Sequence, residues 1–527
     1  MINTPTPTPA QKISEHITGE KQKGLRVKKT LLIYPPLGSD DVFIKDVPLS
    51  VVYLAAESVK EGYPIEILDL RLYPDWKEEL RKHLTADVML TGISVMTGNP
   101  IKNAIAITNF IKENSDSKVV WGGHHPTMEY ESTMRFDKID FVIRGFGSNP
   151  LKMLIGELLK DKPDFTNVPS LSYRQDGRVI HNTQSKGWEM IPFRNIPYFL
   201  IDENIDKYNR INLGKKERLM PIFTSMGCPY RCSFCMAPTM YKDRDKKWVT
   251  FEVDEVIEHI KFLVEKYNVT YLSVYDDDSF IDIERMRRIM ERIIEEGIKL
   301  KIDFRGARIN ELDRMGDEYF ELMVRAGVSH FQVGLESGSQ KVLNIMNKKI
   351  NYDQIVRVNR RLARYNLTPI YNLMAGVPGE TIEDLKLTRD LVLKLYEENK
   401  NCITGFPTKF KPLPGTVLYN EAVKHGLKPI DKLEDWIAID TGESDMFFPW
   451  YTKESNNYIN MFQITSYFID NKIIREIPPT TLFNKILRII AVIYRPIALL
   501  RLKYDITAFN IEYLMYRLFR KWARKEV

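Results

Sequence analysis

Three of the four cysteines in this 527-residue chain lie within eight residues of one another. Cys228, Cys232 and Cys235 form a C-x3-C-x2-C pattern in the stretch TSMGCPYRCSFCMAP. Three thiolates on one short loop can hold three irons of a cubane iron–sulfur cluster, and they leave the fourth iron open to a substrate or a cofactor. The spacing therefore favours an iron–sulfur site that does chemistry.

Zinc is the alternative metal for such thiols. A structural zinc site usually takes four ligands in closely paired positions. The fourth cysteine, Cys402, lies far downstream, and the nearest downstream histidine, His259, lies in the middle of a predicted helix. The spacing favours the cluster over zinc, and Cys402 is most simply a buried apolar residue. A zinc-stabilised binding protein stays open as a function of another class.

Length and composition point to a globular protein without disulfides. A chain this long suggests roughly two to four domains and can bury ample core without cross-links. The segment 1–27 is polar, lacks the apolar core of a signal peptide, and predicts a disordered lead-in. We therefore expect a cytoplasmic protein, where clustered thiols are more often ligands than disulfides.

The N-terminal part alternates short apolar runs with helix-like segments. Strands are expected in five runs: 30–36, 64–70, 87–94, 118–123 and 139–145. Such alternation predicts an α/β fold with a doubly wound parallel sheet, in which ligands bind beyond the carboxyl ends of the strands. Small residues follow several of these strands and would form the floor of a site.

A second β/α run extends from Met220 to about Gly426. Its six units predict a partial barrel whose active site lies at the carboxyl ends of the strands. The cysteine loop follows the first expected strand directly. A connector lies between the two runs. It contains Asp176 and Gly177, a pair typical of tight turns, which predicts a hairpin.

Several motifs in a fixed order resemble those of one enzyme family. The cysteine loop, with Phe234 before its last cysteine, resembles the signature of the radical S-adenosylmethionine (SAM) superfamily. Five downstream segments fall in that family's order: YDDDSF, DFRGARIN, GLESGSQKVLNIMNKK, GVPGET and PLPGT. The upstream loops GISVMTG and GGHHPT are similar to those of cobalamin-binding domains. Over most of residues 28–426 the chain resembles the cobalamin-dependent radical SAM enzymes.

The resemblance implies a division of the chain into five parts. After the lead-in come a cobalamin-binding-like domain, a connector, a radical SAM core built as a partial (β/α)6 barrel, and a helical, basic C-terminal region. The expected ranges are 28–160, 161–217, 218–430 and 431–527.

In this family the open iron of a [4Fe–4S] cluster binds SAM, and one electron splits the sulfonium to give a 5′-deoxyadenosyl radical. The resemblance implies that six residues bind SAM: Phe234, Arg308, Glu336, Ser337, Gly376 and Gly379. For Glu336 a second interpretation stays open, since a carboxylate is also favoured at the start of a helix.

For cobalamin the resemblance implies contacts from five residues: Ser94, Thr97, Gly122, Gly123 and Gly145. The chain lacks the D-x-H-x-x-G motif that supplies a histidine to cobalt. His124 and His125 are expected to form a polar loop beside the corrin rather than to bind the metal. The loop RGFGSNP also departs from the family, because Phe146 and Ser148 stand where relatives carry carboxylates.

Three consecutive carboxylates, Asp276, Asp277 and Asp278, follow another expected strand. A magnesium site is conceivable there. A solvated loop is the favoured interpretation.

The basic residues are concentrated at the C-terminal end. From Asn471 to Val527 the chain carries twelve Lys or Arg and four Asp or Glu, so the remaining residues have a slight negative excess. Two segments, 481–504 and 509–525, interleave apolar and basic residues at helical spacing, with Pro496 as a kink or a break. Such helices can lie on a membrane surface or pack on the core with a solvated basic face. The segregated charge favours the membrane.

These patterns predict a cobalamin-dependent radical SAM enzyme that methylates an unactivated carbon of an apolar, lipid-like substrate. The alternative within the resemblance is oxidative cyclisation or C–C bond formation on a tetrapyrrole or lipid without methyl transfer. We expect a ferredoxin or flavodoxin as electron donor, peripheral contact with the membrane, and no nucleic-acid partner.

Overall fold

We describe the protein from a computed structural model. It describes residues 28–38, 46–212, 215–439, 448–470, 472–477, 479, 482–508 and 513. The predicted lead-in over 1–27 and nearly all of the second amphipathic tail segment lie outside the described residues.

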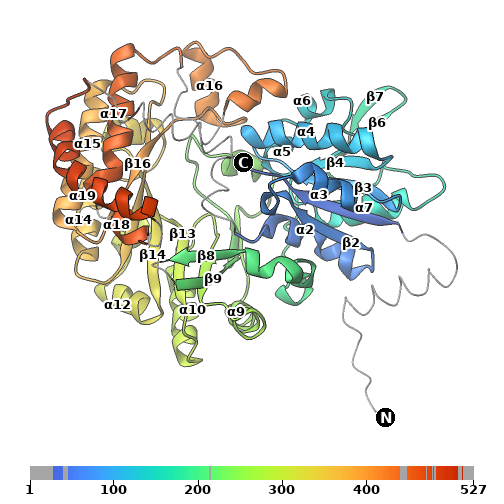
Figure 1. Ribbon diagram of the computed structural model, residues 1–527, viewed down its shortest axis with the longest axis horizontal. Helices are drawn as coiled ribbons and strands as arrows, with labels where there is room; N and C mark the ends of the chain where they lie inside the picture. The colour runs from blue at the N-terminus through green and yellow to red at the C-terminus, as the bar shows by residue number, and fades with distance from the viewer. Residues whose placement is uncertain are drawn as a thin grey trace.

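The N-terminal part of the molecule is built on a seven-stranded sheet with helices on both faces (Figure 1). Its strand order is β2-β1-β3-β4-β5-β6-β7, and the first five strands are parallel. The strands are β1 (Lys29–Tyr34), β2 (Ile65–Asp69), β3 (Val88–Ser94), β4 (Lys118–Gly122), β5 (Phe141–Ile143), β6 (Leu171–Gln175) and β7 (Arg178–His181). The helices are α2 (Leu49–Lys60), α3 (Trp76–His83), α4 (Asn99–Asn114), α5 (His124–Met128), α6 (Tyr130–Arg135) and α7 (Ser148–Leu158).

The predicted hairpin around Asp176 and Gly177 is confirmed. The strands β6 and β7 are antiparallel and extend the first sheet at β5. Part of the expected connector is thus built into this sheet.

The apolar pattern explains why α4 forms and where it packs. Proline stands at its first turn, where a missing N–H costs nothing. Ile101, Ala104, Ile107 and Ile111 recur at helical spacing and are all fully buried. One stripe of the helix is therefore committed to the sheet.

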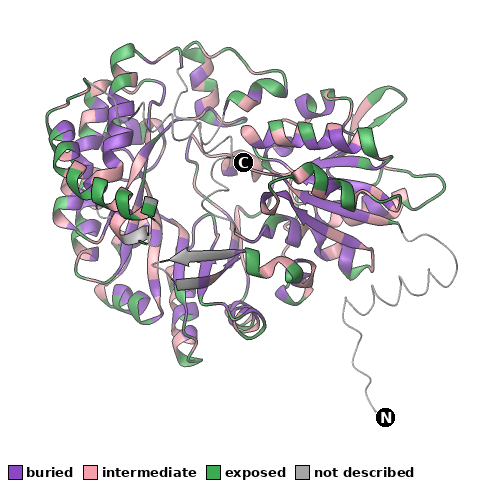
Figure 2. Ribbon diagram, viewed as in Figure 1, coloured by how far each residue is buried: buried purple, intermediate pink, exposed green. Residues whose placement is uncertain are grey.

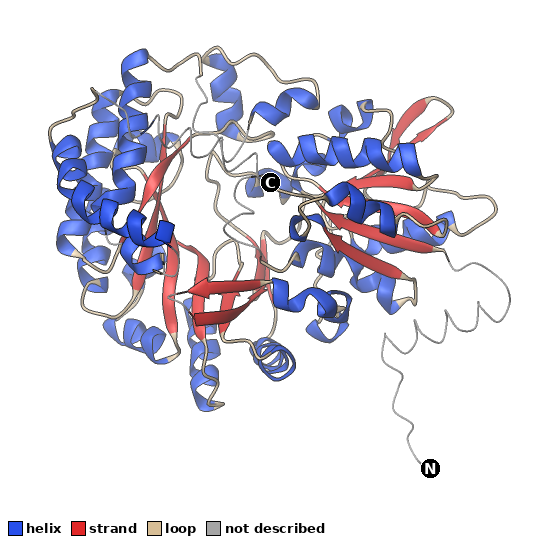
Figure 3. Ribbon diagram, in the orientation of Figure 1, coloured by secondary structure: helices blue, strands red, loops and turns tan. Residues whose placement is uncertain are grey.

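The second large sheet also has seven strands, and it curves into an open barrel (Figure 3). Its order is β16-β15-β14-β13-β12-β9-β8, with β8 antiparallel and the other six parallel. The strands are β8 (Asn209–Asn212), β9 (Lys215–Ile222), β12 (Tyr271–Val274), β13 (Lys301–Ala307), β14 (Val328–Glu336), β15 (Thr368–Ala375) and β16 (Ile403–Lys409). The partial (β/α)6 barrel is confirmed.

The helices of the barrel follow its strands in the expected alternation. They are α9 (Val253–Tyr267), α10 (Ile283–Glu295), α11 (Ile309–Arg314), α12 (Asp317–Arg325), α13 (Gln340–Ile345), α14 (Tyr352–Leu362) and α15 (Ile382–Glu398). The first barrel strand begins at Lys215 rather than at Pro221, because its first half is polar and pairs with β8 at the edge of the sheet.

The C-terminal region is helical, as predicted. It contains α17 (Lys453–Ile469), α18 (Lys472–Glu476) and α19 (Leu482–Lys503), and α16 (Val417–Lys424) precedes it within the range expected for the barrel core. Pro496 lies inside α19, so the helix continues past it. Shorter elements are α8 (Ala237–Met240), β10 (Ser225–Gly227), β11 (Trp248–Thr250) and the 3-10 turns Leu70–Leu72, Phe193–Asn195, Tyr198–Lys207 and Glu434–Ala438.

The core runs through both sheets, and Figure 2 shows the strands buried and the outer faces of the helices exposed. Cys402 is 1% exposed within this core, as expected for an apolar residue. His259 lies in α9, where its Nε2 is 2.9 Å from the Tyr198 hydroxyl. Across the described ranges, no helix is both long enough and apolar enough to pass through a bilayer.

Candidate active site

The cysteine loop follows β10, which pairs antiparallel with β11. Its backbone is held from two sides. The Ser233 N–H donates to the Met346 carbonyl at 2.9 Å, and the Leu418 N–H donates to the Ser233 carbonyl at 2.9 Å. The end of α13 and the start of α16 therefore fix the loop that carries the three cysteines.

The three thiols of this loop suit a metal cluster. Cys232 is buried, and Cys228 and Cys235 are half-buried. Burial raises the pKa of Cys228 to about 12 and that of Cys235 to about 11. Thiols in such surroundings keep their protons until a metal displaces them. The positive charge of iron is therefore what would make these side chains thiolates.

A buried arginine lies against the cysteine loop. Nη1 of Arg308 donates to Sγ of Cys232 at 3.2 Å, and the guanidinium lies 3.9 Å from the centre of the Tyr230 ring. A second guanidinium nitrogen donates to the Lys348 carbonyl. Arg308 is the residue that follows β13, so the barrel places a cation beside the sulfur.

Two buried carboxyl groups lie near Arg308. Asp278 and Glu311 are at most 1% exposed, and each has one carboxyl oxygen with no hydrogen-bond partner among the described residues. The Tyr230 hydroxyl donates to the other oxygen of Glu311. Burial, and next the charge of Glu311, raises the pKa of Asp278 to about 8. Unsatisfied acceptors in a buried site fit a ligand with N–H donors, such as the amino group of SAM.

The interpretation as a solvated loop is wrong for Asp276 and Asp278, which are buried, whereas Asp277 is exposed. Asp276 accepts hydrogen bonds from the Thr224 N–H at 2.7 Å, the Thr224 hydroxyl at 2.6 Å and the Ser225 N–H at 3.0 Å. Asp277 accepts from the Gly227 N–H at 3.0 Å. These side chains brace the entry to the cysteine loop, because the barrel brings the end of β12 beneath it.

The acidic side chains do not assemble around one cation. Within the described ranges no three His, Cys, Asp or Glu side chains lie close enough to bind a single metal ion. A cubane has a different requirement, because each cysteine binds a different iron.

Glu336 is the last residue of β14, not part of a helix start. The helix α13 begins at Gln340 with Ser339 as its cap. The backbone of Glu336 has φ of +70°, which is uncommon for a residue with a side chain. Its carboxylate pairs with Lys348 at 2.9 Å, and both side chains are buried. Lys348 was missed by sequence reasoning, since it is one of two adjacent lysines after α13.

Two other residues expected to bind SAM lie beside this ion pair. The Lys348 ammonium is 5.7 Å from the centre of the Phe234 ring. The Ser337 hydroxyl lies 2.9 Å from the Thr388 hydroxyl and accepts from the Ser339 N–H at 3.1 Å. Ser337 thus shapes the turn after β14, and its contact with SAM stays a prediction.

The turn after β15 contains Gly376 and Gly379, with φ of +84° and +86°. A Cβ at Gly376 would lie 2.1 Å from the Tyr451 hydroxyl, so only glycine fits. The Trp450 indole donates to the Gly376 carbonyl at 2.8 Å. The segment before α17 therefore covers this turn, a feature that the motif did not reveal.

The residues expected to contact cobalamin lie together at one edge of the first sheet. Ser94 ends β3 and Gly122 ends β4. The Thr127 hydroxyl donates to the Gly123 carbonyl at 2.7 Å and accepts from the Gly145 N–H at 2.9 Å. This edge offers hydroxyls and close-packed glycine backbone. Such a neutral polar surface fits the amide side chains of a corrin.

The two histidines of the same edge have different surroundings. His125 is fully buried, with Nδ1 3.2 Å from the Thr97 hydroxyl and its ring against Trp436. Burial lowers the pKa of His125 to about 3. His124, the first residue of α5, is exposed.

The loops of the two sheets meet at a hydrogen bond. The Tyr275 hydroxyl, after β12, donates to the Asp46 carboxylate, which precedes α2. This contact brings the carboxyl-end loops of both sheets face to face.

The loop around Phe146 and Ser148, which departs from the family pattern, is held by residues of the connector. The Glu189 carboxylate accepts from the Ser148 N–H at 2.9 Å and from the Asn149 N–H at 3.3 Å, so it caps the start of α7. Phe146 packs on Trp188 with ring centres 5.3 Å apart. A carboxylate from the connector thus caps the helix that follows this loop.

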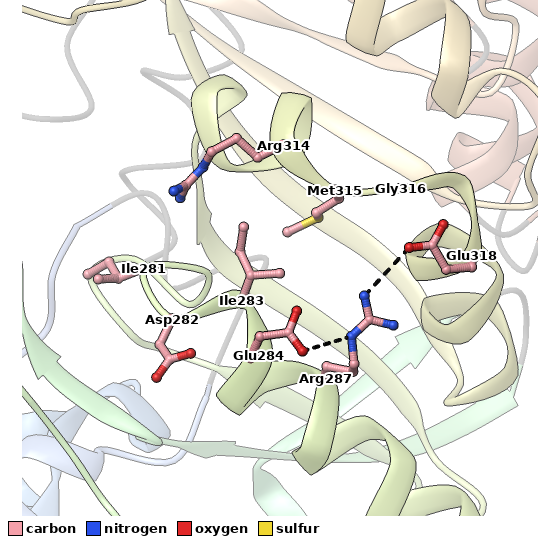
Figure 4. Close-up of a pocket in the computed structure, with 9 residues that line it drawn as sticks. All are labelled: Ile281, Asp282, Ile283, Glu284, Arg287, Arg314, Met315, Gly316 and Glu318. Carbon is pink, nitrogen blue, oxygen red and sulfur yellow. Dashed lines mark ion pairs between the residues drawn. The ribbon is translucent and has the colours of Figure 1, made fainter.

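A separate surface hollow of about 510 Å³ lies between the start of α10 and the turn from α11 to α12 (Figure 4). Arg287 spans it, with ion pairs to Glu284 at 3.2 Å and Glu318 at 3.7 Å. None of the predicted site residues lines it.

Fold and site together define a protein with three clustered cysteines on a barrel and a second, mostly parallel sheet that presents a polar edge. Residues 222–392 match the family model for the radical SAM superfamily, and residues 46–155 match that for the B12 binding domain. The chain belongs to the cobalamin-dependent radical SAM enzymes, whose cofactors are a [4Fe–4S] cluster, SAM and cobalamin. This assignment replaces the zinc-stabilised binding protein.

Relatives named for two reactions are similar to this chain. An uncharacterized methyltransferase, PH0819, from Pyrococcus horikoshii is 27% identical over 76% of this chain and 85% of its own length. An anaerobic magnesium-protoporphyrin IX monomethyl ester cyclase from Rubrivivax gelatinosus is 25% identical over 69% of this chain and 65% of its own length, a little under two thirds.

The fold is similar to that of OxsB, a cobalamin-dependent SAM radical enzyme solved with aqua-cobalamin and SAM bound. The TM-score is 0.68 at 18% identity, over 92% of this chain and 73% of that chain. Both sheets and their order are therefore a shared architecture.

Proposed function

We propose that this protein methylates an unactivated carbon of an apolar small molecule. One observation carries the proposal: the loops at the carboxyl ends of both sheets face each other, with the Tyr275 hydroxyl of one donating to the Asp46 carboxylate of the other. A cluster site and a cobalamin site on these loops would serve one substrate between them.

The cofactors supply the radical and the methyl group when bound. The residues of the chain hold and orient them. Cys228, Cys232 and Cys235 would hold the cluster, and Arg308 keeps a positive charge at the sulfur of Cys232. Asp278 and Glu311 offer buried acceptors for an amino group. Positioning of this kind lowers the entropic part of a reaction barrier.

The relative PH0819 supports methyl transfer, because it is named a methyltransferase and its match covers 76% of this chain, against 69% for the cyclase. Oxidative cyclisation without methyl transfer is the rival reaction, and the cyclase from Rubrivivax gelatinosus is the reason to test for it.

Three finer statements belong to the proposal. The substrate is apolar, the electron donor is a ferredoxin or flavodoxin, and the C-terminal region contacts a membrane surface. The first and third are supported by the exposed apolar side chains of α19. The residues assigned to SAM and cobalamin and the domain boundaries also remain predictions.

The reactions are separated by their products. Anaerobically prepared enzyme with cobalamin, a strong reductant and methyl-labelled SAM would be incubated with a lipid extract. Methyl transfer predicts S-adenosylhomocysteine, 5′-deoxyadenosine and label in an apolar product. Deoxyadenosine without labelled product would support cyclisation instead, and the Cys232→Ala variant should yield neither.

A further inference from the structure

The helix α19 carries most of the exposed large apolar side chains in the described part of the chain. Ten of the fifteen exposed large apolar side chains in that part lie between residues 482 and 506. Five of them recur at spacings of three and four and are 47–67% exposed: Ile486, Ile489, Ile493, Ile497 and Leu500. This set, here called the α19 stripe, lies on one face of the helix.

The arginines of α19 are turned towards the protein. Arg488 donates to the Ile477 carbonyl at 2.7 Å, Arg495 to the Tyr396 hydroxyl, and Arg501 to the Ile506 carbonyl at 3.1 Å. A helix on the surface of a water-soluble protein normally has the opposite arrangement. This also contradicts, for α19, the interpretation as a packed helix with a solvated basic face.

Contacts on the inner face fix this orientation. Ala491, Ala498 and Leu502 are buried, and the helix packs along α17 (Figure 1). The Arg389 guanidinium of α15 donates to the Leu502 carbonyl at 2.7 Å. The α19 stripe therefore cannot turn inwards without breaking these contacts, and Figure 2 shows exposed surface along the helix.

Charge indicates what covers the stripe. Lys485 and Lys503 are exposed, and at 100° per residue both fall on the same flank of the stripe. Apolar side chains flanked by lysines suit the boundary between acyl chains and anionic headgroups. A second protein surface would have no need of the cations.

We propose that α19 lies flat on an anionic phospholipid bilayer and inserts the α19 stripe among the acyl chains. The helix has 22 residues and is about 33 Å long, so it offers an extended line of contact. The proposal deepens the proposed function, since it places the enzyme where an apolar substrate is dissolved. It rests on surface geometry and needs no turnover.

Sedimentation with vesicles tests it. The full chain would be mixed with vesicles of phosphatidylcholine and phosphatidylglycerol, and the bound fraction measured. Wild type should bind, and each of Ile489→Glu and Ile493→Glu should lower the ratio of bound to unbound protein about tenfold. Leu159→Glu, the same change at an exposed leucine after α7, should bind as wild type does. Lys485→Gln with Lys503→Gln should weaken binding to these vesicles more than to pure phosphatidylcholine.

Two results would overturn the proposal. The first is a vesicle result: either wild type fails to bind, or the Ile489→Glu and Ile493→Glu variants both bind as wild type does. The other is a dimer in analytical ultracentrifugation that Ile493→Glu dissociates, with no affinity for vesicles; a second copy of the chain would then cover the stripe. Because the assay uses no SAM, a failure of methyl transfer leaves its outcome unaffected.

Discussion

Arg308 donates a hydrogen bond from Nη1 to Sγ of Cys232 at 3.2 Å. The two residues are far apart in sequence, and the barrel brings the end of β13 against the cysteine loop. A cation at this sulfur stabilises the thiolate form that binds iron.

Replacement of Arg308 by Gln should weaken the cluster. A hydrogen bond to a charged group contributes about 1.5–3 kcal/mol, so we expect iron loss to a chelator to become at least about tenfold faster. The measurement is the decay of visible absorbance under anaerobic conditions. Arg314→Gln, at an exposed arginine of α11, should decay as wild type does. Equal rates for Arg308→Gln and wild type would refute the role of this contact.

The buried ion pair of Glu336 and Lys348 makes a prediction for stability. Lys348→Met leaves a buried carboxylate without its partner, which should lower the free energy of unfolding by about 3–5 kcal/mol in urea. The double variant with Glu336→Gln should recover most of this loss, because no buried charge remains. Lys341→Met breaks a more exposed pair with Asp384 and should cost at most about 1 kcal/mol. A double variant as unstable as Lys348→Met would contradict the explanation.

Local sequence patterns predicted most of the strands and helices named above. One of the helix-like segments between the expected strands is α4, because Pro100 starts it and an apolar stripe at helical spacing fills it. The five strands of the first sheet lie where β-branched runs predicted them. The barrel strand β9 begins six residues before the predicted start, since its polar first half, which pairs with the edge strand β8, has no apolar pattern.

The site was less predictable, because it depends on which loops meet. Asp276 looks like any acidic loop residue until β12 places it beneath Thr224. Lys348 has no local sign of its pairing with Glu336. The sequence also did not predict which face of α19 is exposed. Apolar and basic residues are interleaved along this helix, and its packing on α17 decides which of them face the protein.

Asp276→Asn tests the brace of the cysteine loop. An asparagine has one acceptor oxygen, so at least one buried donor among Thr224 and Ser225 loses its partner. We expect the free energy of unfolding to fall by about 1–3 kcal/mol. Asp282→Asn is the matched control, because asparagine caps a helix as well as aspartate does and α10 should keep its cap. If both variants melt alike, the brace contributes nothing to stability.

His125 predicts a pH dependence. Burial lowers the pKa of His125 to about 3, whereas a histidine in the unfolded chain has a pKa near 6.5. Between these values the unfolded chain binds a proton that the folded chain does not, so stability falls as the pH falls from about 6.5 towards 3. The slope of unfolding free energy against pH should be smaller for His125→Gln than for wild type, by up to about 1.4 kcal/mol per pH unit. The exposed His425→Gln should leave that slope unchanged.

The most direct test of the account is electron paramagnetic resonance of the anaerobically isolated, reduced protein with and without SAM, followed by analysis of the SAM. The account predicts a cluster signal that changes when SAM is added, formation of 5′-deoxyadenosine, and the loss of both in Cys232→Ala. Protein that carries no iron after reconstitution, or an iron-loaded protein that leaves SAM intact in the presence of strong reductant, would contradict it.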